Sequence, residues 1–386
     1  MRLEDKGGAM AKPAITDKEM MAAVEAEAAT AREVMGFVHG HPELGHEEHV
    51  CSAYLARRLE AAGFAVERGI AGMATAFRAT LTGAREGRSV GMVMLYDAVP
   101  AVRADGRIEP VHSCGHGPIA GGVSAAALAL AQLRERLAGR ITVFGCPADE
   151  IHAPGTAKRG GGKAISAAAG LWDGIDAALY AHPEFIDTVS RASLWMRRDR
   201  AVVSGQRSLR KEVVAAPMAA LKRLTAALEL VDPARVILEQ MELSGDVEEG
   251  TGLVLSASLL FFADDEAGIA TVARPLREAL QDARWTEGPV VCGVRPDAGV
   301  GAAVAEAFAA AGRGFVADSP PLPFATDFGN ISQRVSAALI GVGRPGGWRF
   351  HTDEGAQEFA GPDGEAAAMG IARVLAAAAI RLAEPG

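Results

Sequence analysis

The stretch SVGMVMLYD (89–97) decides the fold class of this chain. It is a continuous apolar run that ends on an acid, and such runs are typical of strands in a sheet that is covered on both faces. Similar runs occur at 140–147 (RITVFGCP) and 176–183 (DAALYAHP), with helical stretches at 120–138 and 163–170 between them. The alternation predicts an α/β domain with a mixed, mostly parallel sheet.

The pattern of predicted strands and helices changes near Trp195. Strand-like AVVSG is followed by a helical stretch at 217–230, a strand at 251–262, a helix at 265–281 and a strand near 289–294. This order predicts an inserted α+β module of ferredoxin-like type. We therefore expect one domain from residues 1–196 and 298–386, and an inserted domain from residues 197–297.

Composition limits the classes of function. The chain has 386 residues, 49% of them hydrophobic and 23% charged, which is typical of a soluble globular protein. A net charge of −9 argues against nucleic acid as a partner. No stretch approaches the roughly 18 consecutive apolar residues of a membrane helix, and the N-terminus lacks the apolar run of a signal peptide. The 4 cysteines are scattered, so we expect no disulfide framework and a cytoplasmic location.

Polar residues follow the predicted strands at the point where each run ends. Asp97, the pair Asp149–Glu150, and His182 each come at such a position. Ligands of α/β sheets bind beyond the carboxyl ends of the strands. We therefore expect these side chains to converge on one rim of the sheet.

Five residues form a candidate metal site. They supply thiolate sulfur, imidazole nitrogen and carboxylate oxygen, the ligand mix that suits zinc or a similar divalent ion. These residues are Cys114, His116, Glu150, His182 and His351. Within PVHSCGHGP (110–118), Cys114 and His116 are spaced as neighbours on one face of an extended backbone. A histidine taken alone is usually structural, and we interpret His39, His46, His49 and His112 in that way.

The acid pair also predicts catalysis, because hydrolysis often uses one carboxylate on the metal and a second to accept a proton from water. A cysteine nucleophile built from Cys114 and His116 is an alternative, although their spacing suits chelation better. A protein that binds the metal without turnover is a third possibility, and the intact acid pair argues against it. The segment GTAKRGGGKA (155–164) resembles a phosphate-binding loop, but its spacing fails, so we interpret it as a flexible glycine turn.

The order of the motifs resembles that of a known family. HPELGHEE, LYDAVP, HSCGHG, CPADE, LYAHP, TDFGNIS and FHTDEGAQEF are similar to blocks of the metal-dependent aminoacylase and carboxypeptidase family, which includes hippurate and aminobenzoyl-glutamate hydrolases. The resemblance covers nearly the whole chain except the inserted module. It implies an α/β catalytic domain that binds one or two divalent ions (Zn or Mn), and an inserted lid domain that often mediates dimerisation.

The resemblance also assigns roles by position. It implies that Cys114, His116, Glu150, His182 and His351 are the metal ligands. Asp149 matches the general base, which is normally Glu in the family. Asp97 matches an acidic residue that orients a metal ligand without binding the metal itself.

One departure from the family pattern affects the predicted reaction. Family lids typically carry a histidine that polarises the substrate carbonyl, and no histidine occurs here between His182 and His351. The matching stretch is SGQRSLRKEVVAAP, so Arg207 or Arg210 is expected to bind the negative charge of the substrate, with Asn330 as a further substrate-binding candidate.

The missing histidine favours a reaction without a carbonyl oxyanion. We therefore expect hydrolytic deamination of an aminobenzoate such as 5-nitroanthranilate, as in the deaminating branch of the family. The alternative is hydrolysis of an N-acyl or aminobenzoyl amino acid. In both cases the expected partners are a small anionic aromatic substrate and further copies of the chain in a homodimer or higher homo-oligomer, with no nucleic acid and no membrane.

Overall fold

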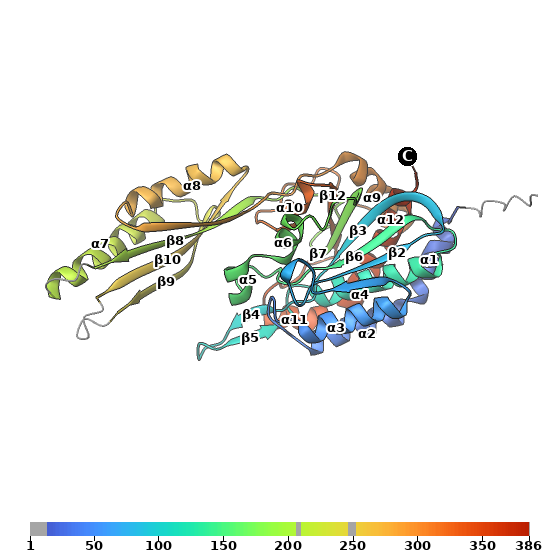
Figure 1. Ribbon diagram of the computed structural model, residues 1–386, viewed down its shortest axis with the longest axis horizontal. Coiled ribbons are helices and arrows are strands. Elements are labelled where there is room, and N and C mark those ends of the chain that lie inside the picture. Colours follow the sequence, from blue (N-terminus) through green and yellow to red (C-terminus); the bar gives the residue numbers. More distant parts are fainter. Residues whose placement is uncertain (1–13, 206–209, 246–251, 386) are drawn as a thin grey trace, which may run out of the picture.

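Two β-sheets organise the chain in the computed structural model, which describes residues 14–205, 210–245 and 252–385. A six-stranded sheet lies in a larger main body, and a four-stranded sheet forms a module to one side of it (Figure 1). A two-stranded hairpin of β4 (Val99–Val102) and β5 (Ile108–Val111) projects from the main body.

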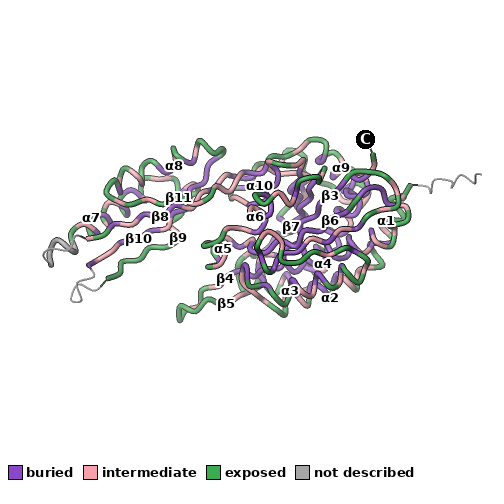
Figure 2. The backbone as a smooth tube through the Cα atoms, viewed as in Figure 1, coloured by how far each residue is buried: buried purple, intermediate pink, exposed green. Residues whose placement is uncertain are grey.

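The main sheet is mixed and mostly parallel, as predicted. Its strand order is β1-β2-β6-β3-β7-β12. β6, β3, β7 and β12 are mutually parallel, whereas β2 and β1 run antiparallel at one edge. The strands span β1 (Ala65–Arg68), β2 (Phe77–Thr82), β3 (Arg85–Met94), β6 (Ala138–Gly145), β7 (Ala177–Glu184) and β12 (Ser336–Gly343). The buried residues concentrate on the central strands (Figure 2), which is why the sequence shows continuous apolar runs there.

Helices pack around this sheet. They are α1 (Asp17–Ala26), α2 (Ala28–Gly40), α3 (His49–Ala61), α4 (His116–Gln132), α5 (Pro154–Arg159), α6 (Gly162–Ala168), α9 (Ala298–Ala310), α10 (Phe328–Ser332), α11 (Asp353–Ala360) and α12 (Pro362–Ala383), with one 3₁₀ turn at Ile70–Gly72. A capping box of Thr16 and Glu19 begins α1. The helical pattern at 17–39 belongs to two helices, because the backbone departs from helical geometry at Glu27.

The apolar helix α12 is a core element. It packs against α4 and against four strands of the main sheet. By length and composition it could cross a membrane, but 78% of its most apolar window is buried inside the protein. Burial against the sheet explains the apolar composition of the helix.

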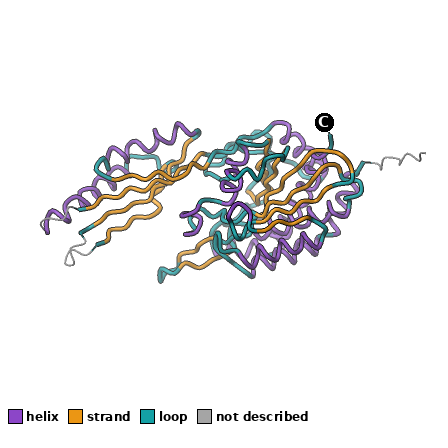
Figure 3. The backbone as a smooth tube through the Cα atoms, in the orientation of Figure 1, coloured by secondary structure: helices purple, strands orange, loops and turns teal. Residues whose placement is uncertain are grey.

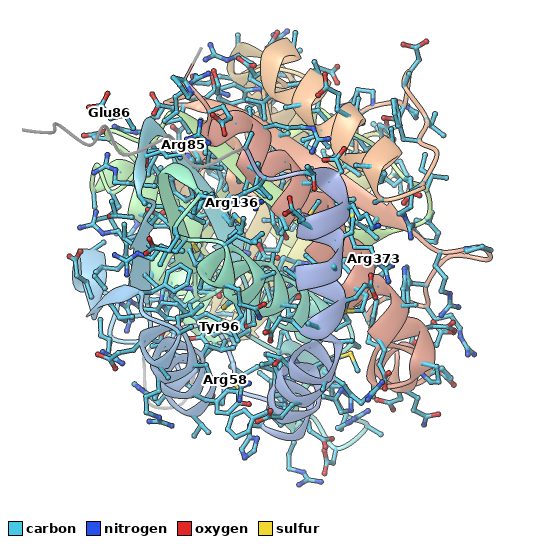
Figure 4. All side chains as sticks on the ribbon, turned by 90° about the vertical axis from the view of Figure 1, so that its right-hand side faces the viewer. Arg58, Arg85, Glu86, Tyr96, Arg136 and Arg373 are labelled. Atoms are coloured by element: carbon cyan, nitrogen blue, oxygen red, sulfur yellow. The ribbon has the colours of Figure 1, made fainter. Side chains whose placement is uncertain are left out.

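Ion pairs fasten the terminal segments at the end of the main body that faces away from the module (Figure 4). Arg85 pairs with Glu384 at 2.7 Å, Arg136 with Glu19 at 2.8 Å, and Arg373 with Glu25 at 2.5 Å. These contacts join α1, α12 and the C-terminal end to elements that are distant in sequence. Exposed pairs of this kind each contribute roughly 0–1 kcal/mol.

The module has the element order β-α-β-β-α-β. Its elements are β8 (Trp195–Ser204), α7 (Arg210–Leu228), β9 (Val236–Ser244), β10 (Val254–Ala263), α8 (Glu266–Ala279) and β11 (Arg284–Val291). All neighbouring strands are antiparallel in the order β11-β8-β10-β9, and α7 and α8 cover one face (Figure 3). This arrangement agrees with the predicted ferredoxin-like topology, although the sequence pattern did not indicate β9. The exact division at residues 197 and 297, and a lid or dimerisation role, stay predictions.

Candidate metal centre and active site

The candidate site lies at the carboxyl ends of three neighbouring parallel strands, β6, β3 and β7. Asp97 follows β3, Asp149 and Glu150 follow β6, and His182 lies near the end of β7. Residues beyond the carboxyl ends of parallel strands meet at one edge of the sheet. The predicted convergence on one rim is therefore present.

All five predicted ligands come together at this rim. Their potential ligand atoms form two groups, Cys114–His116–His182 and Cys114–Glu150–His351, and within each group the atoms lie within 4.8 Å of one another. Cys114 Sγ is 3.3 Å from His351 Nε2 and 3.8 Å from His182 Nε2. Cys114 belongs to both groups, so these five residues are the ones that would hold a divalent ion here.

The segment around Cys114 differs from the predicted extended backbone. β5 ends at Val111, and His116 already begins α4. Between them Gly115 has a φ of +92°, a conformation that side chains rarely adopt, and a Cβ there would come within 2.9 Å of Pro183. The left-handed glycine, not a strand, turns Cys114 and His116 towards the same centre.

Asp97 holds two of the ligands in place. The Asp97 carbonyl accepts a hydrogen bond from His116 Nδ1 at 2.7 Å, and its carboxylate lies 3.1 Å from the same nitrogen. The second carboxylate oxygen accepts from the Glu150 backbone N–H at 2.9 Å. These contacts fix the ring so that Nε2 faces the centre, the arrangement in which metal-ligating histidines are usually held.

Replacing Asp97 by asparagine is expected to weaken metal binding by about 10–100-fold, because the imidazole loses the carboxylate that orients it. Competition with a chromophoric chelator measures this change. Asp105→Asn, in the exposed turn between β4 and β5, is the matched control and should bind metal as the parent protein does. Equal affinity in the Asp97 variant would contradict an orienting role.

The donor set fits a divalent cation. His116 Nε2 and Glu150 Oε1 are buried and have no hydrogen-bond partner among the described residues, a costly arrangement that a bound cation would relieve. Burial, together with Asp97 and Asp149, raises the pKa of Glu150 to about 7. Burial and the nearby His116 lower the pKa of His182 to about 4, which keeps that imidazole neutral and able to bind metal.

Cys114 suits a ligand better than a nucleophile. Burial, and secondarily the Glu150 carboxylate, raises the pKa of the Cys114 thiol. Both a nucleophile and a metal ligand must be a thiolate: a catalytic cysteine needs a pKa that the protein itself lowers, whereas a bound cation deprotonates a coordinating thiol. The surroundings of Cys114 therefore argue against the cysteine-nucleophile alternative.

Asp149 belongs to a buried ion-pair network with Lys163 and Asp327. Lys163 has a fully buried side chain, forms an ion pair with Asp149, and contacts Asp327 at 2.7 Å. Burial opposes ionisation of Asp149, but Lys163 holds the pKa of that carboxyl well below its usual range. The other Asp149 oxygen lies 3.4 Å from His116 Nε2. An ionised carboxylate at the edge of the candidate metal centre is placed to accept a proton.

Sequence reasoning missed Lys163. The segment interpreted as a flexible glycine turn (155–164) contains most of α5 and the first three residues of α6, and Lys163 is one of those three. Its glycines permit close packing: a Cβ on Gly162 would fall 2.1 Å from the Pro147 carbonyl, and one on Gly161 would fall 2.2 Å from an Asp327 oxygen. A lysine within a glycine run next to a predicted site was the signal that could have identified it.

A strained backbone position precedes the acid pair. Ala148 has a φ of +60°, which is uncommon for a residue with a Cβ and is typical of functional sites. Its N–H donates to the buried Glu48 carboxylate at 2.8 Å, and that carboxylate also accepts from Thr75 Oγ1 at 2.7 Å. Glu48, which the sequence analysis did not single out, thus stabilises the turn that directs Asp149 and Glu150.

An apolar cavity of about 370 Å³ opens beside the acid pair, between the main body and the module. Cys114, Asp149, Glu150, His182 and His351 form its polar side. Its apolar wall comprises Phe185, Phe324 and Phe350 from the main body and Ile237, Leu260 and Phe262 from the module. Phe185 is 57% exposed and Phe324 48%, and exposed apolar side chains grouped in a cleft indicate a ligand site.

Of the three predicted substrate-binding residues, only Asn330 has a described side chain, and it does not line this cavity. Asn330 spans the connection to the module: its amide accepts from Cys292 N at 3.2 Å and donates to the Val290 carbonyl at 3.3 Å. Arg207 lies outside the described residues. Arg210 begins α7 at the end of the module away from the main body (Figure 1), and its side chain is not described. Substrate binding by these three residues stays a prediction.

The histidines interpreted as structural lie apart from the two ligand groups. His46 Nε2 contacts the Gly160 carbonyl at 2.9 Å, and His112 is buried near His39. Burial lowers the pKa of His112 to about 3, so the ring is held neutral in the core. His49 is exposed at the start of α3.

Comparison with known proteins yields a family and several relatives. The model of peptidase family M20/M25/M40 matches residues 96–379. One component of the p-aminobenzoyl-glutamate hydrolase of Escherichia coli (strain K12) is 30% identical over 174 residues, 42% of this chain and 34% of that protein. The Xaa-Arg dipeptidase of Mus musculus is 35% identical over 156 residues, 37% of this chain and 32% of that protein. The matches thus span about a third of these relatives.

Solved structures share the fold over most of their length. The Bacillus subtilis YXEP protein, a dinuclear metal-binding peptidase, superposes with a TM-score of 0.68 at 18% identity, covering 93% of this chain and 99% of that one. An aminobenzoyl-glutamate utilization protein from Klebsiella pneumoniae gives a TM-score of 0.68 at 14% identity, covering 94% and 98%. At these identities the likeness concerns the fold.

Proposed function

Because the chain belongs to peptidase family M20/M25/M40, we propose that it is a metal-dependent hydrolase that cleaves the amide C–N bond of a small N-acyl or aminobenzoyl amino acid. The observation that carries this proposal is the placement of the Asp149–Glu150 pair on the wall of the apolar cavity. Relatives that act on aminobenzoyl-glutamate and on Xaa-Arg dipeptides support an amide substrate.

The cavity suits the acyl part of such a substrate. Its aromatic and aliphatic wall can bury a ring or an alkyl chain, and none of the side chains described on it is Lys or Arg. A neighbouring cavity of about 710 Å³ shares Ile151 and Asp327 with it and is lined by Lys158 and Arg200 among others. We place the apolar acyl group in the first cavity and the carboxylate end towards the second.

The residues of the site divide the chemistry. Cys114, His116, Glu150, His182 and His351 would hold one or two divalent ions, Zn or Mn. When bound, such an ion lowers the pKa of water and polarises a carbonyl oxygen. Asp149, kept ionised by Lys163, accepts a proton from the attacking water and returns it to the departing nitrogen. Asp97 keeps His116 in orientation.

Hydrolytic deamination of an aminobenzoate such as 5-nitroanthranilate is the second candidate. The absence of a histidine in the sequence between His182 and His351 favours it, because an aromatic amine substrate develops no carbonyl oxyanion. The relatives support the amidase more strongly, since one of them is a hydrolase of aminobenzoyl-glutamate. A homodimeric assembly and a cytoplasmic location belong to the same proposal.

A substrate screen separates the two reactions. Protein loaded with Zn or Mn is incubated with p-aminobenzoyl-glutamate, N-acyl amino acids, Xaa-Arg dipeptides and 5-nitroanthranilate, and both amide products and ammonia are quantified. We expect amide cleavage that stops on chelation and returns when the metal is restored. Ammonia released from the arylamine without any amide turnover would contradict the amidase and support the deaminase.

A further inference from the structure

A fourth imidazole, besides those of His116, His182 and His351, borders the candidate centre and has no role so far. His152 comes two residues after Glu150, at the end of the same loop. Its half-exposed side chain lines the apolar cavity, and also an adjoining cavity of about 460 Å³, together with Glu150 and His351 in both cases. A substrate whose scissile bond lies at the acid pair would therefore meet the His152 ring.

The module aims this ring. Glu239 on β9 accepts a hydrogen bond from His152 Nδ1 at 2.7 Å, across the gap between the two bodies. The same carboxylate accepts hydrogen bonds from Nε and from a terminal nitrogen of Arg198, each at 2.6 Å. Arg198 also donates a hydrogen bond to the Ile151 carbonyl at 2.7 Å. The module thus holds both the His152 ring and the backbone just before it.

A β-bulge gives Glu239 its direction. Ser258 of β10 is paired with Gln240 and Leu259 with Leu238, so Glu239 is the extra residue on β9. Bulges of this kind redirect a side chain and are frequent beside active sites. Ser258 Oγ donates to the Glu239 carboxylate at 3.1 Å. The bulge directs the Glu239 side chain, and hydrogen bonds from Arg198 Nε, Arg198 Nη2 and Ser258 Oγ hold its carboxylate against His152.

The hydrogen-bond roles of the ring follow from its partner. A carboxylate only accepts, so Nδ1 carries the hydrogen, and in the neutral ring Nε2 is then an acceptor. Nε2 has no partner among the described residues, whereas Nδ1 is occupied. The free acceptor is the atom left to contact a ligand in the cavities.

We propose that His152 is a substrate-contacting residue whose Nε2 accepts a hydrogen bond from the N–H of the scissile amide, and that Glu239 is its positioning residue. The inference rests on the proposed amidase function. The imidazole comes from the catalytic loop and the orienting carboxylate from the module. The site is thus assembled from both bodies.

Substitution of His152 by asparagine and by glutamine tests this assignment. The asparagine amide imitates Nδ1 and can keep the bond to Glu239, whereas the glutamine amide reaches the position of Nε2. We expect His152→Ala and His152→Asn to lower kcat/KM for p-aminobenzoyl-glutamate roughly tenfold, the size of one lost hydrogen bond, and His152→Gln to stay within about threefold of the parent. His49→Asn is the control on α3 and should not change kcat/KM.

Glu239→Gln is expected to lower kcat/KM by roughly threefold, since the ring loses its charged anchor but keeps a polar neighbour. Glu278→Gln, at an exposed position on α8 of the same module, is its matched control. Metal content and thermal melting are recorded for every variant, and unchanged values exclude loss of the metal or of the fold. Full activity in His152→Asn with loss in His152→Gln would overturn the proposal, because it would show a purely structural tether.

A binding measurement separates this inference from the proposed function. Calorimetric titration of p-aminobenzoyl-glutamate and of N-acyl amino acids uses the Asp149→Asn background, in which the ligand is consumed slowly. A roughly tenfold weaker Kd on adding His152→Ala supports the contact even where turnover of the parent fails and the amidase is contradicted. An unchanged Kd overturns the contact even where the amidase is active. Absence of binding by every ligand overturns both.

Discussion

Replacing Lys163 by methionine is expected to lower the free energy of unfolding by about 3–5 kcal/mol, because removal of one partner leaves buried charge uncompensated. The Lys163 side chain is fully buried, and it is the cation between Asp149 and Asp327. Burial raises the pKa of Asp327 even beside Lys163. Without the lysine, two carboxyls would remain at the edge of the metal centre, and activity should fall together with stability.

Urea unfolding of the metal-free protein measures the loss in stability. Lys158→Met, at an exposed position on α5, is the matched control and should change stability by less than about 0.5 kcal/mol. Adding Asp327→Asn to Lys163→Met removes one of the stranded carboxylates and should regain part of the loss. A Lys163→Met protein within about 1 kcal/mol of the parent would contradict a structural ion-pair network.

Replacing Asp149 by asparagine is expected to reduce kcat by about 10²–10⁴-fold while the metal stays bound. Asparagine has nearly the shape of aspartate but cannot accept the proton, and Asp149 belongs to neither ligand group. Steady-state kinetics on the amide found by the screen, with metal analysis of the same sample, gives both values.

Glu150→Gln is the informative companion, because Glu150 belongs to a ligand group and its loss should reduce metal content and activity together. Asp149→Glu restores the residue normal for the family and should retain far more activity than asparagine. An Asp149→Asn enzyme with more than about a tenth of the parent kcat would show that another group accepts the proton.

Much of the site was predictable because strand ends are visible in the sequence. Apolar runs located β3, β6 and β7, and the polar residues that follow them, including Asp97 and Glu150, meet at one rim. Cys114 and His116 were correctly predicted to lie together, but the predicted extended backbone is in fact a turn that leads into α4. Two residues at a spacing of two fit a strand as well as a turn, and the left-handed Gly115 decides between these possibilities only in three dimensions.

The missed residues share a physical cause. Lys163, Glu48 and Glu239 act through partners 14, 100 and 87 positions away in the chain. A charged residue in a sequence is normally interpreted as exposed, and only tertiary packing shows that it is buried and paired. Strand β9 was missed for a related reason, since most of its residues are exposed at a sheet edge and carry no apolar pattern.

The left-handed turn at Ala148 bears on how metal binding and folding are coupled. In small zinc domains the ion organises a disordered chain, so binding and folding are one event. Here the turn is held by a contact within the protein, the hydrogen bond from Ala148 N–H to the Glu48 carboxylate, so part of the backbone cost of the geometry is met by folding itself. We therefore expect the metal-free protein to remain folded, and added ion to raise its melting temperature only as mass action requires.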